Sequence, residues 1–406
     1  MSVDSPGLHS SCSRSRPPSS RCSVIFFTRH CPAPTESLYM SEALNSGHTE
    51  GDGPFTRRAA RLLSELTGGG HVLLTPSGTH ALELAALALD VGPEDEVVMP
   101  SYTFSSTANA FALRGARLRW ADIDPRTFSM EAEQLEAAWT PRTTVVVTMP
   151  YGGVNRDMER IASMCAARGV RLVEDAAHAL FANVGGRPFG SFGQLSALSF
   201  HRSKNVSCGE GGALLIRDPA LAVRAETLRE KGTDRSRFLR GEVDKYTWQE
   251  AGSSLLLSDI LAAVLTAQLE SSRDSQRHRM ALWRRYAELL EPEGERLGLS
   301  FQQTPAGAEH PAHVFAVRLP AQVDRAALLK DMAAEEVRVA SHYEPLHLSP
   351  YQARIRQGAP APSLPETESL APRLLRLPLH GGMTLEDADH AARAFVRCLE
   401  REAQAR

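Results

Sequence analysis

The feature that most constrains the fold of this chain is a regular alternation of short apolar runs with longer helical stretches. Four of the apolar runs cover residues 96–99, 116–120, 144–148 and 171–173, and helical stretches such as 158–168 separate them. Strands that alternate with helices in this way are typical of a mostly parallel sheet with helices on both faces. We therefore expect an α/β fold.

Length and composition narrow the class further. The chain has 406 residues, 42% of them hydrophobic and 23% charged, which is an ordinary globular mixture with enough length for two or three domains. A net charge of −3 gives no general attraction to nucleic acid, and no apolar run has the length of a membrane helix. Six cysteines without a CxxC pair or a metal-ligand cluster predict a reduced, cytoplasmic chain without a metal.

Three regions are expected along the chain. Residues 1–23 are rich in Ser, Arg, Pro and Cys, which predicts a disordered extension, although a transit peptide and a misassigned start codon remain alternatives. A large domain is expected over residues 24–260 and a smaller C-terminal domain over residues 261–406. A long helical region near the boundary would connect the two. The small domain is predicted to contain strands at 314–319 and 337–340 and helices at 325–335 and 385–400.

One lysine lies between two predicted strands. An apolar run at 197–200 enters a polar turn that holds Lys204, and a glycine-rich bend at 209–212 leads into the next apolar run. Burial there would disfavour the charged form of the amine and lower its pKa, as a lysine that forms a Schiff base requires. The alternative is a surface lysine in a hairpin turn.

A carboxylate and a helix start complete the pattern. The apolar strand before Asp175 ends in that residue, with His178 three positions later, and Ser77-Gly78-Thr79 opens a helix after a strand. Strand ends contact ligands in α/β sheets, and free amides at a helix start bind anions. A phosphate cradle, an acid and a lysine in this order are typical of a pyridoxal 5′-phosphate (PLP) site. Taken singly, Asp175 and the Ser77 turn could each be a plain helix cap.

These segments resemble the DegT/StrS family of PLP-dependent sugar-nucleotide aminotransferases, from about residue 24 to the C-terminus. The resemblance implies fold type I, the aspartate aminotransferase-like architecture, with a mostly parallel mixed sheet in the large domain and a smaller α/β domain after it. It implies that Lys204 carries PLP, that Asp175 holds the pyridine nitrogen, and that His178 lies beside the ring. Glutamine is commoner than histidine at the place of His178.

The same resemblance assigns further residues. Ser77, Gly78, Thr79 and Ser199 would hold the phosphate, and Phe104 would stack on the cofactor unless it is a core residue. The remaining candidates are Ser253 and Ser254 for the cofactor of the partner subunit, and Tyr102, Arg229, Lys231, His342, Tyr343 and His347 for the substrate. His342 could instead be a strand-end histidine, and the basic residues near Arg229 a solvated face. Pro150, Ser254 and Leu256 stand where the family commonly has histidine, asparagine and arginine.

The resemblance also implies an activity. Residues 229–258 indicate transfer of the amino group of L-glutamate to the 4-keto carbon of dTDP-4-dehydro-6-deoxy-D-glucose, by a homodimer that binds neither nucleic acid nor membrane. Amination at C3 and a UDP-linked acceptor are the nearest alternatives. Related dehydratases carry histidine in place of Lys204, which argues against that reaction. A regulator that binds PLP without catalysis would need a DNA-binding module, for which residues 1–23 are too short.

Overall fold

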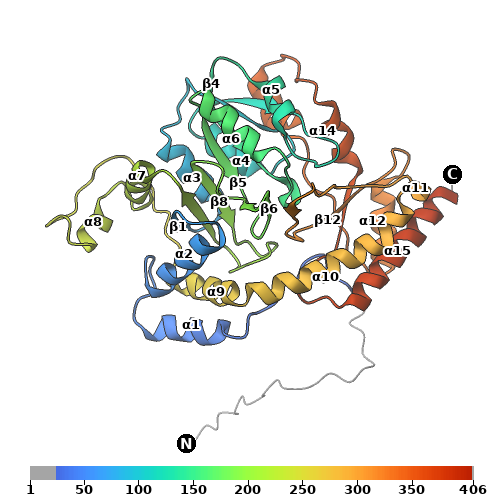
Figure 1. Ribbon diagram of the computed structural model, residues 1–406, viewed down its shortest axis with the longest axis horizontal. Coiled ribbons are helices and arrows are strands. Elements are labelled where there is room, and N and C mark those ends of the chain that lie inside the picture. Colours follow the sequence, from blue (N-terminus) through green and yellow to red (C-terminus); the bar gives the residue numbers. More distant parts are fainter. Residues whose placement is uncertain (1–23, 405–406) are drawn as a thin grey trace, which may run out of the picture.

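A seven-stranded sheet forms the centre of the molecule (Figure 1). The computed structural model describes residues 24–404, so the predicted extension over residues 1–23 lies outside the described part of the chain. In sheet order the strands are β1 (His71–Thr75), β9 (Gly212–Ile216), β8 (Leu195–Ser199), β5 (Arg171–Asp175), β4 (Thr143–Thr148), β2 (Glu96–Pro100) and β3 (Arg117–Ala121). Only β9 in this sheet runs antiparallel to its neighbours. The predicted mostly parallel sheet is confirmed.

Each face of this sheet supports its own core. Successive side chains of a strand point to opposite faces, and in β4 this places Val145 and Val147 in one core and Val146 in the other. The first core is covered by α3 (Gly78–Ala88), α4 (Ser105–Ala112) and α7 (Pro219–Arg229). The second is covered by α2 (Pro54–Leu66), α5 (Ala132–Ala138), α6 (Met158–Ala167) and α9 (Asp259–Glu270). Because both faces are buried, the strands read as continuous apolar runs.

A smaller C-terminal unit packs at one side of this layered body (Figure 1). Its helices are α10 (Ser272–Leu290), α12 (Arg325–Ala334) and α15 (Leu385–Gln404), and its sheet has the order β10 (Ser300–Phe301), β12 (Phe315–Arg318), β13 (Leu374–Leu377). Side chains of α9 belong to the large core, whereas Leu282, Tyr286 and Leu290 of α10 belong to the small one. The packing therefore changes at Ser271, and the predicted boundary at residue 260 stays a prediction.

One predicted element of the small unit is wrong. The segment 337–340 is not a strand, because Val337 and Ala340 make single bridges in different directions, to Ile25 and to Arg376. The other elements are α1 (Glu36–Asn45), α8 (Arg235–Leu239), α11 (Gly294–Leu297), α13 (Pro350–Arg356), α14 (Pro365–Leu370), β6 (Asn183–Val184), β7 (Arg187–Pro188), β11 (Ala308–Glu309) and four short 3₁₀ turns. Within residues 24–404, no helix has the length and apolar character needed to cross a bilayer.

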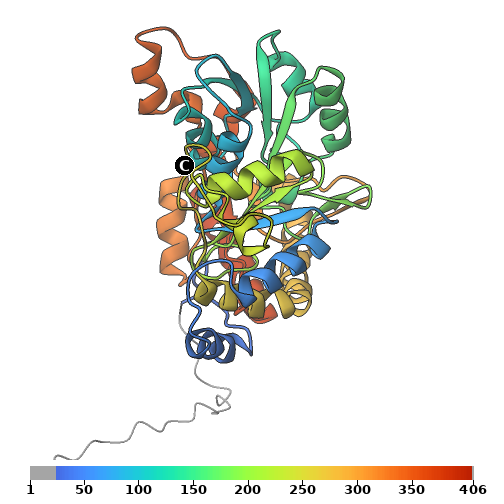
Figure 2. The same ribbon diagram turned by 90° about the vertical axis from the view of Figure 1, so that its left-hand side faces the viewer.

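The arrangement gathers several chain segments at one edge of the large sheet. The parallel strands β1, β5 and β8 all end at this edge, and the antiparallel β9 begins there. Figure 2 shows the same layers after a quarter turn, with the C-terminal segments beside the sheet. Polar residues that follow different strand ends, from Ser77 to Lys204, are thus brought together although they are separated in the sequence.

Candidate active site

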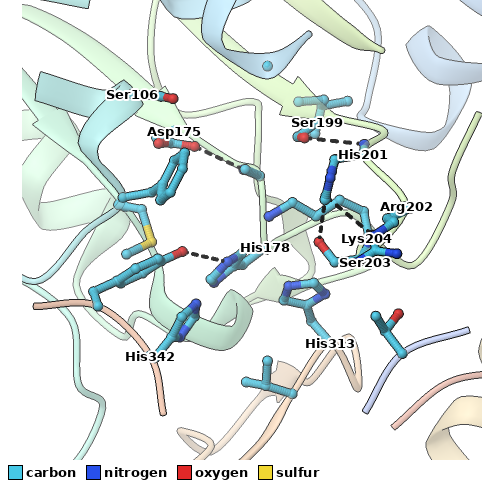
Figure 3. A pocket seen from close by; sticks show the side chains of 18 of the residues that line it. Ser106, Asp175, His178, Ser199, His201, Arg202, Ser203, Lys204, His313 and His342 are labelled. Carbon is cyan, nitrogen blue, oxygen red and sulfur yellow. Dashed lines mark hydrogen bonds between the residues drawn. The ribbon is translucent and has the colours of Figure 1, made fainter. Parts of the chain in front are cut away.

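A cavity of about 690 Å³ lies where the strand ends meet the small unit. From the large domain it is lined by the predicted residues Ser77, Gly78, Thr79, Phe104, Asp175, His178, Ser199 and Lys204. From the C-terminal unit it is lined by His313, His342, Tyr343 and Arg376. Figure 3 shows that most of these side chains converge from opposite sides. The cavity therefore joins ten of the residues predicted from sequence with others that were not.

Lys204 is the lysine of this cavity. It lies in the turn that follows β8, where the Lys204 amide donates a hydrogen bond to the His201 carbonyl at 2.9 Å. Its side chain extends toward Asp175 and His178 (Figure 3). Burial lowers the pKa of Lys204 to about 8, although the carboxylate of Asp175 opposes the shift. About a tenth of the amine is therefore unprotonated at pH 7, far more than for an ordinary lysine, and this neutral form is the one that acts as a nucleophile or takes up a proton.

Asp175 is the last residue of β5 and is almost fully buried. Its Oδ2 accepts a hydrogen bond from Thr107 Oγ1 at 2.6 Å, and its Oδ1 accepts one from the Ala177 amide at 3.2 Å. Burial raises the pKa of Asp175, against the effects of Thr107 and Lys204. The carboxylate thus has few partners for its lone pairs. A protonated ring nitrogen in the cavity would supply the missing donor and favour its charged form.

His178 is held in one tautomer. Its Nδ1 accepts a hydrogen bond from the Gly152 amide at 3.3 Å, so the proton of the neutral ring lies on Nε2, which contacts the Tyr343 hydroxyl at 2.9 Å. Burial lowers the pKa of His178 well below its usual value, and the charges of Lys204 and Arg376 add to the effect. The ring is therefore a neutral hydrogen-bonding group that connects the large domain to the C-terminal unit.

The start of α3 forms the polar floor of the cavity. Ser77 caps this helix and its hydroxyl accepts from the His80 amide, while the first helical bond is donated by the Ala81 amide. The amides of Gly78 and Thr79 come before that bond and are free for an anion. A Cβ at Gly78 would lie 2.8 Å from the Cβ of Ser199, so only glycine allows this close approach of helix and strand.

Rings form the opposite wall. His342 lies over Tyr343 with 3.7 Å between ring centroids and its Nδ1 contacts the Tyr151 hydroxyl at 2.6 Å, while His313 lies 4.3 Å from His178. Burial lowers the pKa of His313 and of His342 well below the usual value. Phe104 lies at the rim with 58% of its surface exposed, so it is not a core residue. The rings of this wall are polar and uncharged, and Arg376 adds one cation beside them.

Several predicted residues do not line the cavity of this chain. Arg229 is buried and its guanidinium contacts both oxygens of Asp52 at 2.7 Å and the Leu74 carbonyl at 3.1 Å. Lys231 Nζ lies 2.8 Å from a carboxylate oxygen of Glu230. Arg229 is therefore used inside the large domain, whereas Lys231 is half exposed, and neither lines the cavity.

Three further positions lie outside the cavity for other reasons. His347 is fully buried between Ser101 (2.6 Å) and Glu368 (3.2 Å), so it fastens the loop after Tyr343 to the large domain. Tyr102 is fully buried behind Tyr343, with its ring edge-on at 5.6 Å between centroids. Ser253 and Ser254 are exposed on a segment away from this cavity. Any role of Ser253 and Ser254 at a cofactor would have to be in a partner subunit.

Sequence reasoning missed several residues of the site, among them Thr107, Arg376 and His313. Thr107, which donates to Asp175, is one helical turn after Thr103, and hydroxyls four positions apart after a strand end were an available signal. Arg376 is a charge inside the apolar run Leu374–Leu377, which is unusual in a buried strand. His313 precedes β12, and its Nδ1 contacts Asn205 Oδ1 at 2.8 Å, beside Lys204. Only the fold shows that these two belong to the site.

The residues present fit PLP. The cavity combines a lysine of lowered pKa, a buried carboxylate with few donors, free amides at a helix start and an exposed aromatic ring at the rim. The lysine fits the aldehyde of the cofactor, and the carboxylate fits its pyridine nitrogen. The amides fit its phosphate, and the aromatic side chain fits the face of its ring. The cavity volume lies within the range of small-molecule sites.

Comparisons with known proteins agree with this geometry. The DegT/DnrJ/EryC1/StrS aminotransferase family matches residues 31–396. The aminotransferase TlmJ from Streptoalloteichus hindustanus is 32% identical over 93% of this chain and 99% of its own, with a TM-score of 0.84.

Two other solved structures are similar to this chain over most of its length. DesV from S. venezuelae is 29% identical over 90% of this chain and 94% of its own, with a TM-score of 0.81. An aminotransferase from Brucella abortus is 28% identical over 89% of this chain and 94% of its own, with a TM-score of 0.80. The fold is that of the PLP-dependent transferases of fold type I, and the cofactor is PLP. The chain belongs to the DegT/DnrJ/EryC1/StrS family of aminotransferases.

Proposed function

We propose that this aminotransferase acts on nucleotide-linked sugars and moves the amino group of L-glutamate to the 4-keto carbon of dTDP-4-dehydro-6-deoxy-D-glucose. The products are 2-oxoglutarate and dTDP-4-amino-4,6-dideoxy-D-galactose. The observation that carries the amino transfer is the position of Lys204 beside Asp175 in one cavity with a phosphate cradle. The choice of acceptor rests on the resemblance of residues 229–258 to enzymes with that acceptor.

The protein side of the reaction follows from the contacts. Bound PLP supplies an aldehyde that takes up an amino group and a protonated ring that withdraws electrons from the adjacent carbon. Asp175, oriented by Thr107, keeps the ring nitrogen protonated. Lys204 holds the cofactor and, when its amine is free, moves the proton at the reacting carbon, a transfer that contributes ~10²–10⁴-fold in rate. Gly78, Thr79 and Ser199 would hold the phosphate of the bound cofactor.

The aromatic side of the cavity supports binding of the uncharged, hydroxyl-bearing sugar ring of the acceptor. His178, His342 and Tyr343 present neutral rings with polar edges, and their hydrogen-bonding atoms can serve hydroxyl groups without a charge to desolvate. Aromatic faces also pack against the C–H faces of a sugar ring.

A homodimer is part of the proposal. Ser253 and Ser254 are exposed and lie away from the cavity of their own chain. In the proposed assembly they contact the cofactor phosphate of the partner subunit. Large exposed apolar side chains on the same arm of the chain, including Trp248, support a protein contact there.

The test is an absorbance spectrum of the purified protein with PLP, recorded before and after L-glutamate and again after the dTDP-4-keto sugar. Glutamate should convert the cofactor band to that of its aminated form, and the sugar should restore the first band. Analysis of the sugar product then gives the aminated carbon and its configuration.

Each other result has a defined meaning. If glutamate converts the band and this sugar does not restore it, the acceptor is wrong, and the C3 and UDP-linked alternatives are tried next. If the Lys204→Ala variant gives the same spectra as wild type, the assignment of Lys204 is wrong. If PLP binds and no amino donor changes the spectrum, a binding role replaces the enzyme.

A further inference from the structure

One arginine at the mouth of the cavity has no partner within the described part of the chain. Arg202 lines the cavity, is exposed to solvent and stands two positions before Lys204. Across residues 24–404, its guanidinium makes no hydrogen bond, ion pair or contact with an aromatic ring. The other arginine of the cavity, Arg376, instead donates two hydrogen bonds to the Ser341 carbonyl. All the side-chain donors of Arg202 are therefore left for a ligand.

The backbone of Arg202 is nevertheless fixed. Its amide donates to the Gly209 carbonyl at 3.0 Å, and the Lys204 amide donates to the His201 carbonyl at 2.9 Å. His201 and Gly209 also form a bridge of their own. A turn closed by these bonds sets the position of the Arg202 Cα, whereas the side chain keeps its rotamers. An anion that reaches this part of the rim meets a guanidinium with five N–H donors.

Arg202 lies away from the reacting groups. In Figure 3, Asp175 and Arg202 lie on opposite sides of the Lys204 side chain. Burial lowers the pKa of Lys204, and the charges that modify this shift are those of Asp175 and Arg376. Burial likewise lowers the pKa of His178, with contributions from Lys204 and Arg376. Arg202 contributes to neither shift, so its charge is well separated from both groups.

This separation selects the kind of anion. In a nucleotide-linked 4-keto sugar the diphosphate is attached to C1, across the sugar ring from the reacting C4. In an amino acid the α-carboxylate is attached to the reacting carbon itself. A cation at the mouth, away from the Lys204 amine, therefore fits the diphosphate better than the carboxylate. A guanidinium also matches phosphate oxygens with two parallel N–H donors.

The phosphate of the cofactor is the alternative anion. Its cradle, the start of α3 together with Ser199, is half-buried and supplies donors of its own, whereas Arg202 is exposed. Glu210 shares the mouth, but its carboxylate lies 3.8 Å from His201 Nε2 and does not pair with Arg202. The arginine is therefore better placed for an anion that enters from solvent than for one on the floor of the cavity.

We infer that Arg202 binds the diphosphate of the nucleotide-linked acceptor, and that it thereby favours nucleotide sugars over free sugars as substrates. This inference rests on the proposed function. The guanidinium donates to diphosphate oxygens at the mouth, while the sugar ring reaches past it to the rings of His342 and Tyr343. Because Arg202 is exposed, solvent screens the contact, and we expect it to be worth about fivefold in affinity at low salt.

The experiment titrates the PLP-loaded enzyme with dTDP, which carries the diphosphate and has no keto group to react. Calorimetry at low salt should show saturable binding to wild type and about fivefold weaker binding to Arg202→Gln. Arg202→Lys should lie between the two, since a point charge replaces the planar fork. Arg160→Gln, at an exposed position on α6 outside the cavity, removes one positive charge as a control and should bind like wild type.

Salt and kinetics give two further readouts. Added salt should weaken dTDP binding to wild type more than to Arg202→Gln, because only wild type has the screened contact. In Arg202→Gln the value of kcat/KM for the nucleotide-linked keto sugar should fall about fivefold, while the value for glutamate should stay within about twofold.

The other outcomes overturn the inference in different ways. Equal dTDP affinity in Arg202→Gln and wild type overturns it while the aminotransferase function stands. Weaker binding of PLP to cofactor-free Arg202→Gln, with unchanged dTDP affinity of the PLP-loaded form, assigns the arginine to the cofactor phosphate instead. A wild-type enzyme that reacts with glutamate and does not bind dTDP overturns the proposed acceptor, and this inference with it. If Arg202→Gln does not fold, the comparison of Arg202→Lys with wild type decides through the same titration.

Discussion

At the scale of single residues, the site depends on charges that burial has altered. Lys204 and Asp175 face each other in a cavity where burial lowers the pKa of the lysine and raises the pKa of the aspartate, so that it favours the neutral form of each. Without the cofactor, the fold therefore carries the energetic cost of burying the charged forms of Lys204 and Asp175. Stability of the cofactor-free protein should show this cost.

We expect Lys204→Met to stabilise the cofactor-free protein below pH 8. The folded-state pKa of about 8 is lower than the ordinary 10.5, so below pH 8 the fold must bury a charged amine. The difference corresponds to up to about 3 kcal/mol, less the attraction to Asp175 that the variant loses. Between pH 8 and 10.5 the unfolded chain binds more protons, so wild type gains stability as the pH rises and the advantage of the variant shrinks.

Urea unfolding of both proteins at several pH values measures this difference. Lys330→Met, at an exposed position on α12, controls for the loss of a lysine and should change the unfolding free energy little at any pH. An advantage of Lys204→Met that stays constant from pH 7 to pH 10 would contradict the role of burial.

At the scale of elements, the start of α3 decides whether a phosphate can bind. The helix, the end of β8 and the start of β9 meet there, and both Gly78 and Gly212 are close enough to a neighbour to exclude a side chain. Sequence alone identified the strand–turn–helix and its anion-binding amides. The closeness of β8 and β9 could not be predicted, because it depends on the order of strands in the sheet.

Gly78→Ala should weaken PLP binding by about 10- to 100-fold. The added Cβ would be 2.8 Å from Ser199 Cβ, so the helix start must move away from the strand and from the phosphate. The local helix itself should not suffer, since alanine is the better helix former. Fluorescence titration of the cofactor-free protein with PLP measures the affinity.

Gly92→Ala provides the matched control, because a Cβ at that glycine meets no atom within 4 Å. It should bind PLP like wild type. If Gly78→Ala and Gly92→Ala lose the same amount of PLP affinity, then the loss does not arise from the close contact at Gly78, and the prediction is wrong.

At the scale of the whole molecule, one arm of the chain projects from the body and exposes apolar side chains to solvent. The segment between α7 and α9 projects from the body with α8 near its tip (Figure 1), and it exposes Phe238, Leu239, Tyr246 and Trp248. Trp248 has 76% of its surface in solvent. Apolar side chains gathered on one arm are typical of a protein contact, in keeping with the proposed homodimer.

Sedimentation velocity should therefore give a dimer for wild type and a shift toward monomer for Trp248→Glu, because a buried charge without a partner opposes association. Leu113→Glu, at a comparably exposed leucine on another part of the surface, controls for an added surface charge and should leave the dimer intact. A wild-type monomer, or a dimer that is unaffected at Trp248, would contradict the arm as the interface.

The sequence by itself determined the class of fold and the centre of the site. Strand and helix periodicity are local properties, so the alternating sheet, Asp175 at a strand end and Lys204 in a turn could be derived from neighbouring residues. The tertiary structure alone decided which distant groups meet them. Arg376 reaches the cavity and Thr107 reaches Asp175, whereas Arg229 and His347 are used in contacts inside the fold. Burial, and with it every pKa in the site, arises only when strand order and the docking of the C-terminal unit bring these segments together.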